Sequence, residues 1–91
     1  MSSIQLVIKG KVQGVFYRAS AREVAEKLGI TGWIKNTPEG FVQIAANGSD
    51  EQLQEFISWC KTGPSKAIVT EIIVNSVKEE NLKGFKIIKD H

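Results

Sequence analysis

Apolar residues change their spacing along this chain, from a period of two to a helical period and back, and this change constrains the fold more than any other feature. Ile4, Leu6 and Ile8 alternate with Gln5, Val7 and Lys9, and this period of two predicts a β-strand. Helical spacing then predicts a helix over about 17–28, which Gly29 ends in a left-handed conformation. The apolar residues are Ile4, Leu6 and Ile8 in the strand, and Tyr17, Ala21, Val24 and Leu28 in the helix.

A hairpin is predicted next. Residues 30–36 and 41–46 have the composition of two strands, and Val42, Ile44 and Ala46 share one face of the second. The connection between them, Thr37-Pro38-Glu39-Gly40, predicts a turn, because proline presets the first central position and glycine suits the last.

A second helix and two further strands complete the pattern. The helix is predicted to follow Ser49, since Ser49 and Gln52 have the spacing of a capping box, and to end at Gly63-Pro64. Residues 68–77 and 84–89 are predicted to be strands. The apolar face of this helix is formed by Leu53, Phe56, Ile57 and Cys60.

The order of elements predicts the fold class. The 91 residues suffice for one core, so we expect a single domain over residues 1–91. Two helices that are apolar on one side must cover one face of a sheet. The prediction is an α+β fold, a ferredoxin-like βαββαβ sandwich, in which an antiparallel sheet carries two helices on one face, plus a short C-terminal strand. Because this fold serves many functions, the function must come from the site.

Composition and charge exclude several classes of protein. A net charge of +2 is too small to indicate general binding to nucleic acid. No apolar stretch approaches the roughly 20 residues that span a bilayer, and the N-terminus lacks the pattern of a signal peptide. We therefore expect a cytoplasmic protein with no membrane and no nucleic-acid partner.

Few side chains offer acid–base, nucleophilic or metal-binding chemistry. His91 is the only histidine and the last residue, so no histidine base is expected. Cys60, the only cysteine, lies on an apolar helix face and is predicted to be a packed structural thiol. Glu79 and Glu80 are predicted to be solvated in a polar loop. No acidic cluster has metal-ligand spacing, so we predict no metal and no cofactor.

The segment from Gly10 to Arg18 carries the clearest functional signal. It follows a strand and opens a helix, and residues 1–22 contain no carboxylate. Successive backbone N–H groups in such a loop, together with a helix N-terminus, attract anions. Arg18 can add two donors for phosphate oxygens. The same residues also fit a plain connection with a solvent-exposed arginine, and the physics alone leaves both interpretations open.

Asn36 is the second candidate. It stands at the end of a predicted strand, immediately before the turn at 37–40, where an asparagine side chain commonly satisfies turn backbone. Its amide could instead accept a hydrogen bond from a water molecule and donate one to an oxyanion. The fold makes proximity to the loop at 10–18 plausible.

These residues resemble the acylphosphatase family. Gly10-Lys11-Val12-Gln13-Gly14-Val15-Phe16-Tyr17-Arg18 is similar to the first signature of that family. Gly32-Trp33-Ile34-Lys35-Asn36, followed by Gly40, Val42 and Gly48, is similar to the second. The terminal Gly84-Phe85-Lys86-Ile87 is similar to the last strand of the family, and Tyr17 stands where the family usually has phenylalanine.

The resemblance implies an enzyme that hydrolyses the carboxyl–phosphate bond of acyl phosphates to a carboxylate and inorganic phosphate. It implies that Arg18 binds the phosphoryl group with backbone N–H groups of residues 14–18, and that Asn36 positions the attacking water. We expect a metal-independent monomer that acts on a small-molecule acyl phosphate. The implied substrate-binding residues are Gly14, Val15, Phe16 and Tyr17.

This sparse set of residues suits an activated phosphate. A carboxylate leaving group, whose conjugate acid has a pKa of about 4–5, departs without a proton, so no general acid is required. Charge stabilisation and alignment of the water then remain for the protein to supply. The alternatives are a non-catalytic phosphate-binding module, alone or within a larger maturation enzyme, and an RNA-binding module. The aromatic residues that RNA binding needs on the first and third strands are mostly missing.

Overall fold

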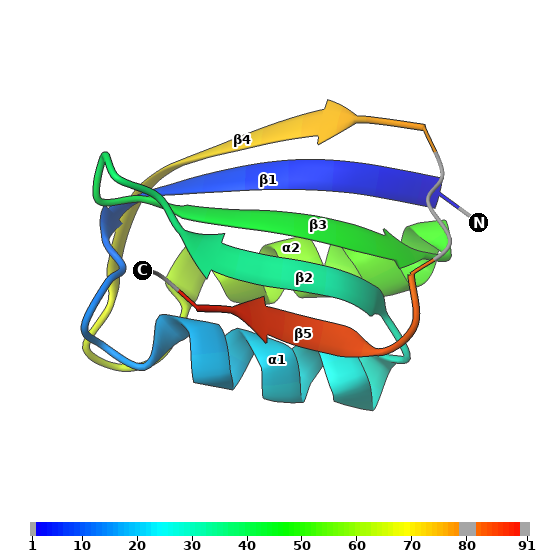
Figure 1. Cartoon of the computed structure of the whole chain (residues 1–91), viewed down its shortest axis with the longest axis horizontal. Coiled ribbons are helices and arrows are strands. Elements are labelled where there is room, and N and C mark those ends of the chain that lie inside the picture. The colour runs from blue at the N-terminus through cyan, green and yellow to red at the C-terminus, as the bar shows by residue number, and fades with distance from the viewer. Residues whose placement is uncertain (1, 79–81, 90–91) are drawn as a thin grey trace.

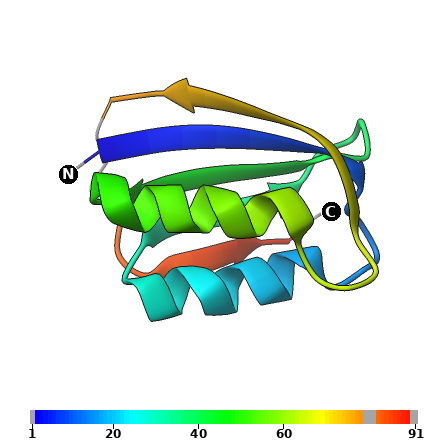
Figure 2. The ribbon, with the colours of Figure 1, turned by 180° about the vertical axis from the view of Figure 1, so that it is seen from behind.

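The computed structural model describes residues 2–78 and 82–89. Over these residues the chain forms a five-stranded sheet with two helices packed on one face, as Figures 1 and 2 show from opposite sides. The predicted elements are all present. Their bounds are β1 Ser2–Lys11, α1 Tyr17–Leu28, β2 Thr31–Asn36, β3 Val42–Gly48, α2 Asp50–Thr62, β4 Ile68–Ser76 and β5 Phe85–Ile88.

The sheet has the strand order β4-β1-β3-β2-β5. The ferredoxin-like core is antiparallel as predicted, since β1 pairs with β3 and β4, and β2 pairs with β3, in antiparallel registers. The predicted short C-terminal strand, β5, is added to this core by pairing with β2 in parallel, so the complete sheet is mixed. Because β4 runs antiparallel to β1, β4 finishes at the same end of the sheet at which β2 begins (Figure 1). The last strand, β5, also starts at this end. Its start is held there by the backbone N–H of Gly32, which donates to the carbonyl of Gly84 at 2.9 Å.

The core lies between the sheet and the helices. The predicted faces of β1, β3 and α2 are buried as expected, except that Ile57 is only partly buried. In α1 the buried residues are Tyr17, Ala21 and Ala25, while Val24 and Leu28 pack at the margin of the core. Small alanine side chains bring this helix close to the sheet. The central side chains are Leu6, Ile8, Ile34, Val42, Ile44, Leu53, Phe56 and Cys60.

The two helices begin in different ways. The predicted capping box of α2 is confirmed, because Gln52 N donates to Ser49 Oγ at 3.1 Å and Ser49 N donates to Gln52 Oε1 at 2.8 Å. At the start of α1, Phe16 adopts a left-handed conformation with φ 63° and provides no side-chain cap. The first amide groups of α1 therefore have no side-chain partner from the N-cap residue.

Two expectations concern isolated side chains. Cys60 is buried and free, as predicted. Glu79, Glu80 and His91 lie outside the described residues.

No helix in the described part of the chain is long and apolar enough to cross a membrane.

Candidate active site

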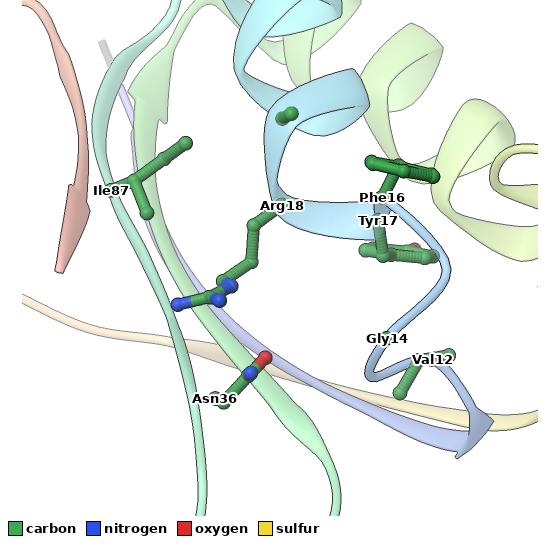
Figure 3. A pocket seen from close by; sticks show the side chains of 8 residues that line it. Val12, Gly14, Phe16, Tyr17, Arg18, Asn36 and Ile87 are labelled. Carbon is green, nitrogen blue, oxygen red and sulfur yellow. The ribbon is translucent and has the colours of Figure 1, made fainter. Parts of the chain in front are cut away.

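A pocket of about 300 Å³ lies where the loop after β1 meets the ends of β2 and β5 (Figure 3). It is bordered by the start of α1 on one side and by the sheet on the other. Five of the six residues predicted for the site from the sequence line it. The lining residues are Val12, Gly14, Phe16, Tyr17, Arg18, Ala19, Asn36 and Ile87.

The loop between β1 and α1, residues 12–16, forms one side of the pocket and is named here the binding loop. Gly14 and Phe16 both have positive φ, of 73° and 63°. For phenylalanine this conformation costs about 1–2 kcal/mol, and the ring is nevertheless 76% exposed. Backbone strain of this kind persists where surrounding structure requires it, and it is concentrated at functional sites.

Val15 differs from its neighbours in the binding loop. Its side chain is 6% exposed and belongs to the hydrophobic core, so it anchors the loop and does not line the pocket. Of the predicted substrate-binding residues, Gly14, Phe16 and Tyr17 line the pocket and Val15 does not. Val15 can therefore contribute to the site only through its backbone N–H group.

Arg18 extends from the first turn of α1 into the pocket. Its guanidinium donates to the carbonyl of Ile88 at 3.5 Å and, among the described residues, it pairs with no carboxylate. Lys9 and Arg22 differ in this respect, because they pair with Glu71 and Glu26. A guanidinium stays charged at all physiological pH values, so Arg18 presents a positive charge to the pocket.

Asn36 is the last residue of β2 and lies on the same face of the sheet as the buried Ile34. That face carries the helices, so the Asn36 side chain lies on the same side of the sheet as α1. Figure 3 shows the side chains of Arg18 and Asn36 pointing toward one another. The structure thus brings together the two residues that the sequence singled out for catalysis, although they are 18 positions apart and on different elements.

Three lining residues were not predicted from the sequence. Val12 is the first residue of the binding loop, Ala19 lies in the first turn of α1, and Ile87 comes from β5. The alternation of Phe85 and Ile87 could have indicated an inward face for this strand. Only the parallel pairing of β5 with β2 brings Ile87 to the pocket, and the pattern does not contain that pairing.

The titratable groups near the pocket are poor nucleophiles at neutral pH. The Tyr17 hydroxyl donates to the carbonyl of Cys60 at 2.7 Å, and burial raises the pKa of this phenol far above its usual range. Burial also raises the pKa of the Cys60 thiol to about 12. No group of three or more potential metal ligands occurs in the part of the chain that is described, and the lining residues include no carboxylate, imidazole or thiol.

The fold and the pocket together define a ferredoxin-like domain in which an arginine from the first turn of α1 and a strained loop face one pocket. The acylphosphatase family model matches residues 4–87. An acylphosphatase from Methylococcus capsulatus is 42% identical over 94 residues, covering 99% of each chain. The crystal structure of acylphosphatase from Bacillus subtilis has a TM-score of 0.94 at 34% identity, covering 97% of this chain and 99% of that one. The chain belongs to the acylphosphatase family, and the resemblance seen in the sequence is confirmed.

A similar domain also occurs within a larger protein. The structure of full-length HypF in its phosphate- and nucleotide-bound form matches 98% of this chain with a TM-score of 0.81 and 28% identity. The match covers only 12% of the HypF chain. The acylphosphatases from Methylococcus capsulatus and Bacillus subtilis, by contrast, are matched over almost their whole length.

Proposed function

We propose that this chain hydrolyses the carboxyl–phosphate bond of acyl phosphates, using Arg18 and Asn36 as its catalytic residues. The single observation that carries the proposal is the convergence of both side chains on one pocket beside the binding loop. Membership of the acylphosphatase family supports the same reaction class.

The phosphoryl group is bound by charge and by backbone donors. Its oxygens accept hydrogen bonds from the guanidinium of Arg18 and from N–H groups of residues 14–18. The uncapped N-terminus of α1 supports this role, since unpaired amide groups and the helix dipole favour an anion there. Arg18 has no competing carboxylate among the described residues, so its charge is available to the substrate.

The bond between phosphorus and the acyl oxygen breaks as water attacks phosphorus. The bonding electrons leave with the carboxylate, which is stable without a proton, so no acid side chain is needed. Arg18 stabilises charge on the transferring group, and the amide of Asn36 orients the attacking water. A loose transition state needs no strong base, which agrees with a pocket that has no imidazole or carboxylate in its wall.

We also propose that residues 1–91 act as a single domain and as a monomer in the cytoplasm, on small-molecule substrates and not on nucleic acid. The one cysteine is buried and free, as suits a reducing compartment.

Replacement of either catalytic residue tests the function directly. We expect Arg18→Ala to lower kcat/KM for benzoyl phosphate by about 10³-fold, as expected for loss of a transition-state arginine. We expect Asn36→Ala to lower it by about 10²-fold, as expected for loss of one positioned polar donor. Release of inorganic phosphate is the measurement, with circular dichroism to show that each variant is folded.

Two controls separate this activity from its alternatives. A phosphomonoester such as p-nitrophenyl phosphate is expected to be a poor substrate, because its leaving group is a poorer one. Wild-type protein that binds phosphate but turns over no benzoyl phosphate would instead identify a non-catalytic binding module. Variants that retain wild-type turnover would show that the catalytic residues lie elsewhere.

A further inference from the structure

Gln13 lies in the binding loop and contacts the hairpin that carries Asn36. Its side-chain amide donates to the carbonyl of Phe41 at 2.8 Å and to the carbonyl of Thr37 at 3.0 Å. Both contacts span more than twenty positions in the sequence, and the side chain is half-buried. One amide group therefore joins the segment that holds the phosphoryl group to the turn that directly follows Asn36.

The chemistry of the two acceptors requires the amide nitrogen at this position. Both partners are carbonyl oxygens, so only an NH₂ group with two protons can satisfy them together. Each carbonyl also accepts a bond within the turn, from Gly40 N to Thr37 O at 3.1 Å and from Thr37 N to Phe41 O at 2.9 Å. The turn is thus closed by its own backbone hydrogen bonds, and the Gln13 amide links this closed turn to the binding loop.

The contact sets one distance that matters for catalysis. The backbone of the binding loop fixes the phosphoryl group, and Asn36, one residue before Thr37, fixes the attacking water. A link between loop and turn therefore holds nucleophile and electrophile at a constant separation. We propose that Gln13 is a positioning residue that keeps Asn36 aligned with the phosphate-binding loop. This inference rests on the proposed function.

The test compares kcat with phosphate affinity in full-length variants. Gln13→Met keeps the length of the side chain and removes both donors. We expect kcat for benzoyl phosphate to fall about 10- to 100-fold, because a small misplacement of a positioning group has effects of this size. The inhibition constant of inorganic phosphate is expected to stay within about twofold, because Arg18 and the loop amides are intact. An exposed glutamine on α2 provides the matched control, and Gln54→Met is expected to change neither quantity.

A double-mutant cycle distinguishes positioning from general support of the fold. If Gln13 acts through Asn36, Gln13→Met in the Asn36→Ala background lowers kcat no further. Losses that multiply in the double variant would overturn the proposal, as would a phosphate inhibition constant that rises as much as kcat falls. If Asn36→Ala lowers kcat while Gln13→Met does not, this inference fails and the proposed function stands.

A second variant tests the donor chemistry itself. Gln13→Glu has the same shape, but its carboxylate faces two carbonyl oxygens and offers no proton. We expect it to be less active than Gln13→Met at pH 8, and its kcat relative to wild type to rise as the pH falls to 5, when a protonated carboxyl can donate once. The ratio for Gln13→Met is expected to stay flat over this range. A flat ratio for Gln13→Glu as well would overturn the proposal.

Discussion

Tyr17 connects the start of α1 to the end of α2 through its hydroxyl group and its aromatic ring. Its hydroxyl donates to the carbonyl of Cys60, and its ring lies 5.4 Å from the ring of Trp59 at an angle of 54°. A side chain at Gly63 would come within 2.6 Å of the Tyr17 ring, so a glycine fits there. The hydroxyl that distinguishes Tyr17 from the usual phenylalanine is thus buried with a partner, and it lies behind the binding loop.

The same environment makes Cys60 inert. Burial raises the pKa of its thiol from 9.0 to about 12, so the thiol stays neutral and inaccessible in the folded protein. The stability that the neutral thiol contributes is complete below about pH 9 and is lost as the pH rises through about 12. We expect no reaction of Cys60 with a disulfide reagent at pH 8 in native protein, and complete reaction in guanidinium chloride. Equal rates in the two conditions would contradict this expectation.

At the scale of elements, an irregularity at the end of β1 directs the chain toward the site. The register between β1 and β4 shifts between Lys9 and Gly10, which marks a bulge. Gly10 has φ 124°, and a Cβ atom there would lie 2.1 Å from the carbonyl oxygen of Ile68. The bulge thus requires glycine, and it lies two residues before the binding loop begins.

Alanine at two glycines separates this steric requirement from backbone strain. Gly40 also has positive φ, but a Cβ atom there would contact nothing within 4 Å. We expect Gly40→Ala to lower the free energy of unfolding by about 1–2 kcal/mol, the cost of the left-handed conformation. We expect Gly10→Ala to lower it by more than about 4 kcal/mol, because the added atom overlaps backbone. Guanidinium chloride denaturation measures both, and similar losses for the two would contradict the steric argument.

The sequence predicted the elements better than their relations in space. Periodicity and capping residues predicted the bounds of α1 and the start of α2, because these features depend on residues a few positions apart. The sequence did not predict the direction of β5, because an alternating pattern is the same in a parallel and an antiparallel strand. Arg18 and Asn36 stood out by their position in motifs. Gln13 and Ile87 also lie in these motifs, but they were not singled out, since their contacts join segments far apart in the chain.

At the scale of the whole molecule, the site is assembled from three separate segments. The binding loop with the start of α1, the end of β2, and β5 each supply part of one pocket. Among the described residues that line the pocket, Arg18 is positively charged and none is a carboxylate of the kind that holds a divalent cation. The chemistry of this set of side chains therefore favours direct binding of the phosphoryl group.

This composition predicts how the activity responds to a chelator. We expect hydrolysis of benzoyl phosphate to proceed at an unchanged rate in excess EDTA, because Arg18 and backbone amides supply the charge that a metal ion supplies in other phosphatases. Phosphate release from treated and untreated protein is the measurement. A rate that falls in EDTA and recovers when a divalent cation is added would show that a metal ion takes part.

The missing side-chain cap at the start of α1 has a consequence for turnover. In the proposed mechanism the amides at this helix start bind the phosphoryl group of the substrate, so orthophosphate released by hydrolysis binds the same donors. Each cycle must therefore wait for that product to depart, and orthophosphate from the surroundings competes for the vacancy. An enzyme built in this way works fastest where orthophosphate is scarce, so its rate of consuming energy-rich anhydrides follows the phosphate status of its environment.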